Sequence, residues 1–480
     1  MRPIGESGIL GGNWHAGPLW LTRASIVLGL LAASLAIGFA AAAGHLDTIP
    51  LLILISAVAC LGTLLLYRLG RFEYGILLVP LTAGLLNFAT LPTGTQSRIV
   101  MSLIVVFGLT GVWVLQWAVA DQQQRLRPSS INAPVIAFIA ISLISFVWSS
   151  LVRDPMLYVP ASFLVVQLAA LAVNISLPFL ALMVSNKIRE IDWLRWLNWI
   201  VVGLGALAVI SFLFQLPTHL LISNGARGVF PAWVGALVGA QALINEDLAK
   251  WQRALLLALL AALGYYYFIT IPDWFSGWLP LGVALGVVVF RRSRKLFLVV
   301  LLFETAFLAT HPTVITQNVI GQAQNKGDFE RLDLWRNNLD LIAQHPLLGV
   351  GPAGYTPYYM TYHPQDARST HNNYFDVLAQ TGILGFVVFL WLLVRLLVIA
   401  WDNCRQLANR RDFAEAFATA TLAGGVAACV AMMLGDWVLP FAYNQTIAGF
   451  DNASLTWILL GAAVSLHHIL AAQNPIKTDT

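Results

Sequence analysis

The sequence predicts an all-α, polytopic membrane protein, and its composition, its long apolar runs and its charge pattern indicate this class. Hydrophobic residues make up 58% of the 480 residues and charged residues 10%, whereas a soluble domain carries about 25% charged residues. Apolar runs of about 17 to 25 residues, long enough to cross about 30 Å of hydrocarbon, recur along the chain. Because backbone groups inside a bilayer must bond internally, we expect these runs to be helices.

The apolar runs predict roughly fourteen transmembrane helices, with an error of about two (a range of about 12–14). The first run begins about twenty residues into the chain and has the length of a full span, which favours a retained anchor over a cleaved signal peptide. The expected spans are near 20–43, 48–67, 73–91, 97–120, 131–151, 160–185, 193–215, 228–245, 254–271, 275–290, 295–311, 376–402, 414–434 and 453–471.

The chain shows no repeat with a period of about 20–50 residues and no linker between two compositions, so we expect one membrane domain. Residues 1–311 are predicted to form an N-terminal transmembrane bundle. Residues 312–375 form a sizeable extracytoplasmic loop subdomain, and residues 376–480 add the C-terminal transmembrane helices of the same domain.

Basic residues predict the orientation, because cytoplasmic turns of membrane proteins carry an excess of Lys and Arg. Turns rich in Lys and Arg alternate with turns nearly free of them, which puts the basic turns and both termini in the cytoplasm and the 312–375 loop outside. The basic turns contain Arg68 and Arg71, Arg125 and Arg127, Lys187 to Arg195, Lys250 and Arg253, Arg291 to Lys295, and Arg405 to Arg411. The basic residues left on the outer side are Arg98, Arg153, Arg227, Lys326, Arg331, Arg336 and Arg368.

Several functional classes find no support in the sequence. The net charge of +4 follows from the charge bias of the turns, so it does not indicate nucleic-acid binding. Cys60, Cys404 and Cys429 lie in spans or on the inner side, which predicts neither a disulfide framework nor a cysteine metal site. The external turns also lack the clustered carboxylates that a metal-dependent enzyme requires, so we expect no metal and no cofactor.

The longest polar stretch, Phe329 to Gly385, is the expected place for chemistry, since polar groups between membrane spans face water or line a cavity. It begins with an amphipathic helix over Asp328–Gln344, predicted to lie along the membrane surface. Arg331 is four residues before Trp335 and shares its inward side, where it needs an anionic partner, either a structural carboxylate or a substrate phosphate. The inward residues are Leu332, Trp335, Leu339 and Ile342, and the outward ones are Asp333, Asn337 and Asp340.

Gly349, Gly351 and Gly354 spell the dinucleotide fingerprint G-x-G-x-x-G. A nucleotide site needs a preceding strand and a βαβ unit, which this loop does not offer, so we reject that assignment. We expect the glycines to end the surface helix and to allow a close turn whose N–H groups can face an anion. Four tyrosines follow, for which an interfacial aromatic belt is favoured over a platform for sugar rings, and they are Tyr355, Tyr358, Tyr359 and Tyr362.

His371 is the leading candidate for a catalytic residue. It is predicted one or two residues before a helix begins, where the positive helix end disfavours an imidazolium and keeps the ring neutral. A neutral imidazole can accept a proton. The alternative is a structural histidine bonded to Asn372 or to a loop carbonyl.

Together these residues resemble the core pattern of the O-antigen ligase and polymerase family, which includes bacterial O-linked oligosaccharyltransferases. The resemblance covers about sixty residues by motif, and the hydropathy of the whole chain is similar to that family's many-span layout. The matching pattern is Glu330-Arg331, Trp335, His345-Pro346-Leu347, Gly349-Val350-Gly351, His371-Asn372-Asn373-Tyr374, Gly382 and Gly385.

The resemblance implies a metal-independent glycosyltransferase in the bacterial inner membrane. Such an enzyme takes a glycan from undecaprenyl pyrophosphate on the outer face and passes it to a hydroxyl of a glycan, glycolipid or protein acceptor. His371 matches the family's proposed base, and Arg227, in the turn Asn224 to Pro231, is similar to an upstream Arg that faces the pyrophosphate. The residues assigned to substrate binding are Arg227, Arg331, Asn372, Tyr374 and Tyr355.

One departure from the family pattern concerns a second pyrophosphate-binding Arg, usually found in a Ser-Arg-Gly sequence. Here the corresponding stretch is Asp273-Trp274-Phe275-Ser276-Gly277-Trp278. Either Arg336 or Arg368 replaces that Arg, or the donor carries less phosphate charge, or the family reaction has been lost. A polymerase of the same family and a transporter are the alternative functions, the latter supported only by Glu304 near the centre of a span.

Overall fold

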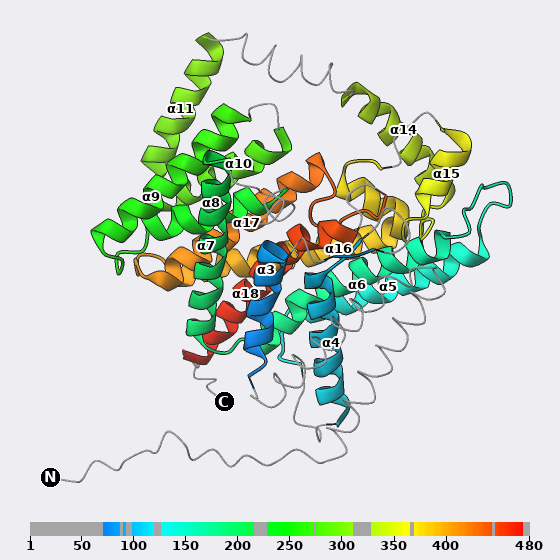
Figure 1. Ribbon diagram of the computed structural model, residues 1–480, viewed down its shortest axis with the longest axis horizontal. Helices are drawn as coiled ribbons and strands as arrows, with labels where there is room; N and C mark the ends of the chain where they lie inside the picture. The colour runs from blue at the N-terminus through cyan, green and yellow to red at the C-terminus, as the bar shows by residue number, and fades with distance from the viewer. Residues whose placement is uncertain are drawn as a thin grey trace, which may run out of the picture.

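The computed structural model of the chain describes residues 71–86, 90–92, 98–119, 126–215, 228–271, 275–310, 328–364, 369–443 and 447–473 (Figure 1). The protein is mostly helical over these ranges. The first two predicted spans lie outside the described residues. Every predicted span from 73–91 onward coincides with a helix.

Apolar helices make up the bulk of the described chain. Seven of the described helices, α5, α6, α7, α9 with its π-helical extension, α16, α17 and α18, are long and apolar enough to cross a membrane. The helices are α3 Glu73–Leu85, α4 Met101–Val119, α5 Asn132–Leu151, α6 Phe163–Lys187, α7 Ile191–Leu213, α8 Phe230–Leu243, α9 Lys250–Gly264, α10 Phe275–Arg292, α11 Arg294–Thr310, α14 Asp328–Gln344, α15 Tyr355–Tyr362, α16 Asn373–Gln406, α17 Phe413–Leu434 and α18 Phe450–Gln473. A π-helix, Tyr265–Thr270, extends α9, and a 3-10 turn, Ile447–Gly449, precedes α18.

Small residues let the central helices α8, α17 and α18 pack closely. A Cβ added to Gly424 of α17 would lie 2.1 Å from the Trp233 ring of α8. The Trp233 indole Nε1 donates a hydrogen bond to Thr456 Oγ1 of α18 at 2.9 Å. Close backbone approach and interhelical hydrogen bonds are what hold helices together in lipid, where burial of apolar surface gives no driving force.

Several of the predicted cytoplasmic turns meet at one end of the bundle. Arg411 and Glu246 form an ion pair with 2.9 Å between Nη1 and Oε1. Arg291 Nη2 donates to the Cys404 carbonyl at 2.8 Å, and the Arg195 guanidinium lies 5.5 Å from the centre of the Phe413 ring. Four of the turns that the charge pattern assigns to one side of a membrane therefore lie close together.

A short antiparallel ribbon departs from the all-α expectation. Strands β1 (Thr90–Pro92) and β2 (Arg98–Val100) pair with Thr90 opposite Val100. The predicted spans 73–91 and 97–120 were too long at these ends, since α3 ends at Leu85 and α4 begins at Met101. Pro92 has no N–H to donate and sits at the end of its strand, a position that tolerates proline.

Helix α14 has the predicted bounds, but the prediction of its inward face was partly wrong. Leu339, expected to point inward, is 49% exposed, whereas Leu334, Leu341 and Ile342 are buried. Helix α14 packs on α16 and lies beside α15 at one edge of the molecule (Figure 1). Its buried stripe is set by the surfaces of those neighbours.

A second core lies beneath this edge, and it contains three of the four tyrosines expected in an interfacial belt. Tyr355, Tyr358 and Tyr359 are buried, whereas Tyr362 is exposed. Tyr355 stacks on Phe441 with ring centroids 4.4 Å apart. The aromatic-belt expectation is therefore wrong for the three buried tyrosines, which pack with residues of α14 and α16.

Candidate functional site

His371 occupies a constrained position just before α16. The helix starts at Asn373 with Asn372 as its N-cap, so His371 comes two residues before the first helical residue, as predicted. Its backbone φ is +51°, in the left-handed region that costs most side chains energy. His371 is half-buried, while Ser369, Thr370, Asn372 and Asn373 around it are buried. The residues on both sides of His371 are therefore buried, whereas the histidine itself is partly accessible.

Hydrogen bonds on both sides of His371 hold its backbone. Thr370 Oγ1 donates to Asp376 Oδ1 at 2.5 Å, one turn into α16. Asn372 Oδ1 accepts hydrogen bonds from the amides of Tyr374 at 2.9 Å and Phe375 at 3.4 Å, which caps the helix. These surrounding bonds maintain the left-handed conformation of His371, since a strained residue persists only where its surroundings fix it.

Asn373 fixes the same segment to the chain that follows α17. Its Oδ1 accepts from the amides of Val438 and Leu439 at 3.0 and 3.2 Å, and its Nδ2 donates to the Leu439 carbonyl at 2.7 Å. Asn372 Nδ2 also donates to the Met433 carbonyl at 3.3 Å. Both asparagines are therefore bonded to the protein backbone, and Asn372 acts first as a cap.

Helix α14 contacts the histidine segment through Trp335. The indole Nε1 of Trp335 donates to the Thr370 carbonyl at 2.9 Å, and its ring stacks on Phe375 at 5.3 Å. Arg331 lies one helical turn before Trp335 on α14, but its side chain is outside the described part of the structure. The two halves of the sequence motif are thus joined directly at the residue before His371.

A buried polar network lies behind His371. Tyr355 is completely buried, and its hydroxyl donates to Asp376 Oδ1 at 2.5 Å. Burial raises the pKa of Tyr355 well above its ordinary value, so the hydroxyl keeps its proton and remains a donor. Asp436, a second fully buried carboxyl, accepts from the Phe441 amide at 2.8 Å. Tyr355, expected to contact substrate directly, is instead placed to support the histidine segment from below.

The long helix α16 is interrupted at Gly382. This residue has φ +66° and ψ −171°, a conformation open essentially to glycine alone. The break leaves helical N–H and C=O groups without helical partners, which must be satisfied elsewhere in a membrane protein. The carbonyls of Ala379 and Gln380 accept from the amides of Val350 and Gly351 at 2.9 and 3.0 Å.

The turn after α14 also accepts hydrogen bonds from the amides that follow the break. The Ile383 amide donates to the Pro346 carbonyl at 2.8 Å, and the Leu384 amide to the Leu347 carbonyl at 3.3 Å. A Cβ at Gly349 would lie 2.3 Å from the Ala379 oxygen, which explains a glycine there. The expectation that amides of this turn face an anion is therefore wrong, because Val350 and Gly351 bond to α16.

The remaining predicted residues fall in different places. Tyr374 donates from its hydroxyl to the Cys429 carbonyl at 2.9 Å and is half-buried in α16. Arg227 and Arg368 lie outside the described residues. Arg336 is exposed on α14. The described part of the chain thus brings together His371, Asn372, Tyr374 and Tyr355, and leaves the arginines to be tested by experiment.

Sequence reasoning missed Asp376, Thr370 and Gln380. Asp376 and Thr370 hold the histidine segment, and the Gln380 side chain accepts from the Ala353 amide at 3.0 Å. A carboxyl in the first turn of an apolar helix was the available signal for Asp376, since ionisable residues in such helices usually serve a function. Thr370 and Gln380 gave no comparable signal, because both are uncharged, and the partner of Gln380 is 27 residues away in sequence.

Comparison with known protein families identifies one match. Residues 248–390 match the O-antigen ligase family. No curated protein matches the chain. The matched segment contains Arg331, Tyr355, His371, Asn372 and Tyr374, together with the broken start of α16, and it leaves Arg227 outside. The predicted resemblance to an O-antigen ligase-like family is thereby confirmed.

Proposed function

We propose that this chain, a membrane protein with an O-antigen ligase domain at residues 248–390, transfers a glycan from an undecaprenyl-pyrophosphate carrier to an acceptor hydroxyl. The observation that carries the proposal is the half-buried His371, held in a left-handed conformation within that domain. A rigid segment presenting one imidazole suits general-base catalysis, which depends on positioning. Among the described residues, seven helices are able to cross a membrane, the setting that a lipid-linked donor requires.

The proposed reaction is a displacement at the sugar carbon that carries the pyrophosphate. His371 accepts the proton of the acceptor hydroxyl as its oxygen forms the new glycosidic bond, and the bond to the pyrophosphate oxygen breaks. Negative charge then gathers on the leaving pyrophosphate, and Arg227 and Arg331 are proposed to stabilise it. We propose that the reaction needs no metal and takes place on the outer face of the bacterial inner membrane.

A polymerase differs from a ligase only in its acceptor, which is another copy of the lipid-linked glycan. Purified full-length protein supplied with a lipid-linked glycan distinguishes the two directly. Chain growth on the lipid indicates a polymerase, and transfer to an added glycolipid or protein indicates a ligase. No consumption of the donor with either acceptor would contradict the proposal.

Replacing Arg227 or Arg331 with Ala should weaken donor turnover by about 10- to 150-fold. This corresponds to the loss of about 1.5–3 kcal/mol from a hydrogen bond to a charged group. Lys should restore activity only in part, because it lacks the forked guanidinium geometry. Arg195, exposed on α7 and paired with Asp192, is the control, and Arg195→Ala should retain activity. Unchanged transfer by the Arg227→Ala protein would place the pyrophosphate elsewhere.

Single cysteines should report the proposed orientation in a variant without native cysteines. Asp340 is exposed on α14, and Asp340→Cys should react with an impermeant thiol reagent in intact cells, because the 312–375 loop is proposed to face outward. Asp247→Cys, exposed in the turn beside the Glu246–Arg411 ion pair, should react only after lysis. The reverse pattern would overturn the orientation and the proposed active face.

A further inference from the structure

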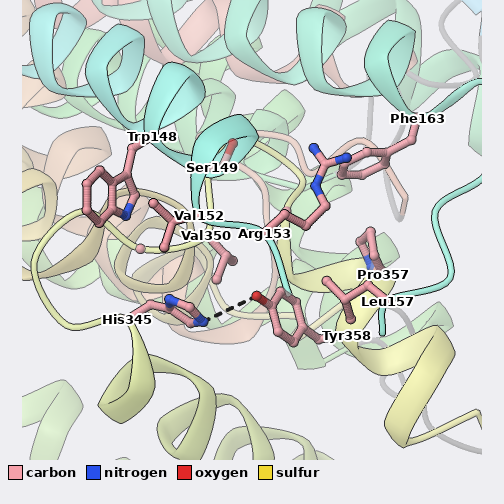
Figure 2. A pocket seen from close by; sticks show the side chains of 12 residues that line it. Trp148, Ser149, Val152, Arg153, Leu157, Phe163, His345, Val350, Pro357 and Tyr358 are labelled. Atoms are coloured by element: carbon pink, nitrogen blue, oxygen red, sulfur yellow. Dashed lines mark hydrogen bonds between the residues drawn. The ribbon is translucent and has the colours of Figure 1, made fainter. Parts of the chain in front are cut away.

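The cavity that Figure 2 shows is too small for a ligand. It lies between the end of α5, the start of α6 and the turn that follows α14, and it has room for about one water molecule. On its wall, His345 Nε2 and the Tyr358 hydroxyl are 3.2 Å apart and hydrogen-bonded to each other. This bond joins α15 to the turn after α14, so the cavity belongs to the packing of these elements.

Two charged residues lie deep inside predicted spans and have no part in the proposed transfer. Arg395 is on α16, ten residues before Arg405, and Glu304 is on α11, ten residues after Arg294. Each is six residues or more from both ends of its helix, which holds for no other charged residue on the described helices that coincide with predicted spans. Ionisable residues inside a membrane usually pair with an opposite charge or serve a function.

Arg395 and Glu304 lie at about the same depth. A helix rises 1.5 Å per residue, so each residue is about 15 Å along its helix from a basic residue of a predicted cytoplasmic turn. The two turns are at the same level, because Arg291 Nη2 donates to the Cys404 carbonyl at 2.8 Å. About 15 Å is half the thickness of the hydrocarbon core, so both residues are near its middle.

The half-buried Arg395 side chain makes no hydrogen bond, ion pair or aromatic contact within the described part of the chain. It borders an exposed apolar ridge of α16, with Trp391 four residues before it and Val398 three residues after it on the same side. The residues of this α16 ridge are 41% to 56% exposed, and they are Val387, Trp391, Val394 and Val398. A guanidinium beside such a face is costly in lipid unless an anionic group covers it.

Helix α11 carries the opposite charge and is itself widely exposed. It packs on α10 and stands at one edge of the molecule (Figure 1). Leu298, Leu301 and Leu302, which precede Glu304, are 54%, 44% and 68% exposed. Within one copy, α16 packs on α17, α17 on α10 and α10 on α11, so two helices separate Arg395 from Glu304. The two residues can therefore meet only between copies.

The first two predicted spans, 20–43 and 48–67, are the other segments of this chain that could cover the α16 ridge. They contain no Asp or Glu, and Asp47 falls in the turn between them. Neither span can therefore neutralise a guanidinium at mid-depth. Among the 23 Asp and Glu residues, Glu304 is the one near the middle of a predicted span. The complementary charge at this depth thus comes from a second copy.

We infer that the α16 ridge is an interface between copies of this chain, in which Arg395 of one copy pairs with Glu304 on α11 of another. Copies inserted with the same orientation carry the two charges at one level of the membrane. An ion pair between helices satisfies both groups where lipid cannot. Because the contact joins two different faces, each copy can also bind a further one. The inference does not depend on the transfer reaction.

Cross-linking between single cysteines tests this interface with full-length protein in phosphatidylcholine bilayers. One population carries Val398→Cys beside Arg395, and the other carries Leu301→Cys about one turn from Glu304, both in a variant without native cysteines. Mixed in one membrane, they should form a cross-linked dimer. Leu143→Cys, which is 45% exposed on α5 away from α11, is the matched control for Leu301→Cys and should leave the Val398→Cys protein monomeric (Figure 1).

Charge reversal tests the ion pair itself. Arg395→Glu should lower the association constant of the copies about tenfold or more, as expected when one member of a close charge pair is lost. Glu304→Arg should do the same, whereas the protein with both changes should associate again, because its charges are exchanged. Damage to the fold would instead accumulate in the double variant. Arg195→Gln, at an exposed arginine paired with Asp192 on α7, is the control and should associate as the wild type does.

Arg395→Gln and Glu304→Gln keep the test decisive if the charge-reversed proteins do not fold, and each should weaken association. The His371→Ala protein should associate as the wild type does, which separates this interface from the transfer reaction. A monomer at every ratio of protein to lipid, counted by single-molecule photobleaching, would overturn the inference. Association that all the charge variants leave unchanged would assign the contact to another face and would overturn it as well.

Discussion

Replacing His371 with Ala should lower the rate of glycan transfer by about 10²- to 10⁴-fold, the usual contribution of a positioned general base. The segment that carries His371 is fixed by Thr370, Asn372 and Asn373, so removal of the imidazole should leave the surrounding backbone in place. The measurement compares initial transfer rates of wild-type and variant proteins purified in equal folded amounts. Because an imidazolium cannot accept a proton, the wild-type rate should also fall as the pH is lowered.

Two further variants make this expectation specific. His363 follows α15 and is exposed, so His363→Ala should retain transfer close to the wild-type rate. His371→Gln can keep a hydrogen bond but cannot take the proton. If the His371→Gln protein showed the wild-type rate and pH profile, His371 would be a positioning residue, and the assignment of a general base would be wrong.

Local patterns predicted much of the segment from α14 to the start of α16. The bounds of α14 and the position of His371 before α16 follow from apolar periodicity and from the polar residues at a helix start. The prediction of which face of α14 is buried was partly wrong, as the exposed Leu339 shows. Several faces of this helix are nearly equally apolar. Packing against α15 and α16 decides which stripe is buried, and that choice depends on tertiary contacts.

The break in α16 could not be predicted from its own sequence. Gly382 lies near the start of a long run that is apolar as far as Arg395, and a single glycine inside such a run is compatible with an unbroken helix. The break depends on Pro346, Leu347 and Val350, more than thirty residues earlier, which bond to the exposed backbone groups. The glycines that resemble a nucleotide fingerprint serve this contact.

The network around Asp376 was missed for the same reason. Its partner Tyr355 is 21 residues earlier, on α15, and only the fold joins the two. Its other partner, Thr370, is six residues earlier and has no pattern that marks it. The sequence alone indicates that Tyr355 is an interfacial aromatic residue. Only the tertiary structure shows that it is buried with its hydroxyl bonded to the carboxyl of Asp376. The sequence therefore predicts the position of His371, but it predicts much less well the residues whose hydrogen bonds hold the His371 segment in place.

These two unpredicted features are physically connected. The break at Gly382 and the carboxyl of Asp376 lie on the same short first segment of α16, which begins just after His371. The turn after α14 bonds to that segment on both sides of the break. A change in the break would therefore shift the segment that holds His371, and a displacement of about 1 Å at a reacting group can cost about 10²-fold in rate.

Gly382→Ala should accordingly destabilise the folded protein and reduce transfer. The φ and ψ of Gly382 cost other residues about 1–3 kcal/mol. An added Cβ would also lie 2.3 Å from the Leu347 carbonyl, so the turn would have to move. We expect the apparent melting temperature of the detergent-purified variant to fall by several degrees, measured at one scan rate because membrane proteins often unfold irreversibly.

Gly203 in α7 is the matched control, because a Cβ there meets nothing within 4 Å and Ala is the better helix former. Gly203→Ala should keep or slightly raise the melting temperature. Ser145→Ala is a milder test of the same contact, since Ser145 Oγ lies 2.6 Å from both the Leu348 and the Gln380 carbonyl oxygens. Removing this hydroxyl leaves buried acceptors with one partner fewer and should cost about 1–3 kcal/mol. Suppose that Gly382→Ala and Ser145→Ala both have the melting temperature of Gly203→Ala and transfer at the wild-type rate. The broken helix then does not hold His371, and only the hydrogen bonds of Thr370 and Asn373 can hold it.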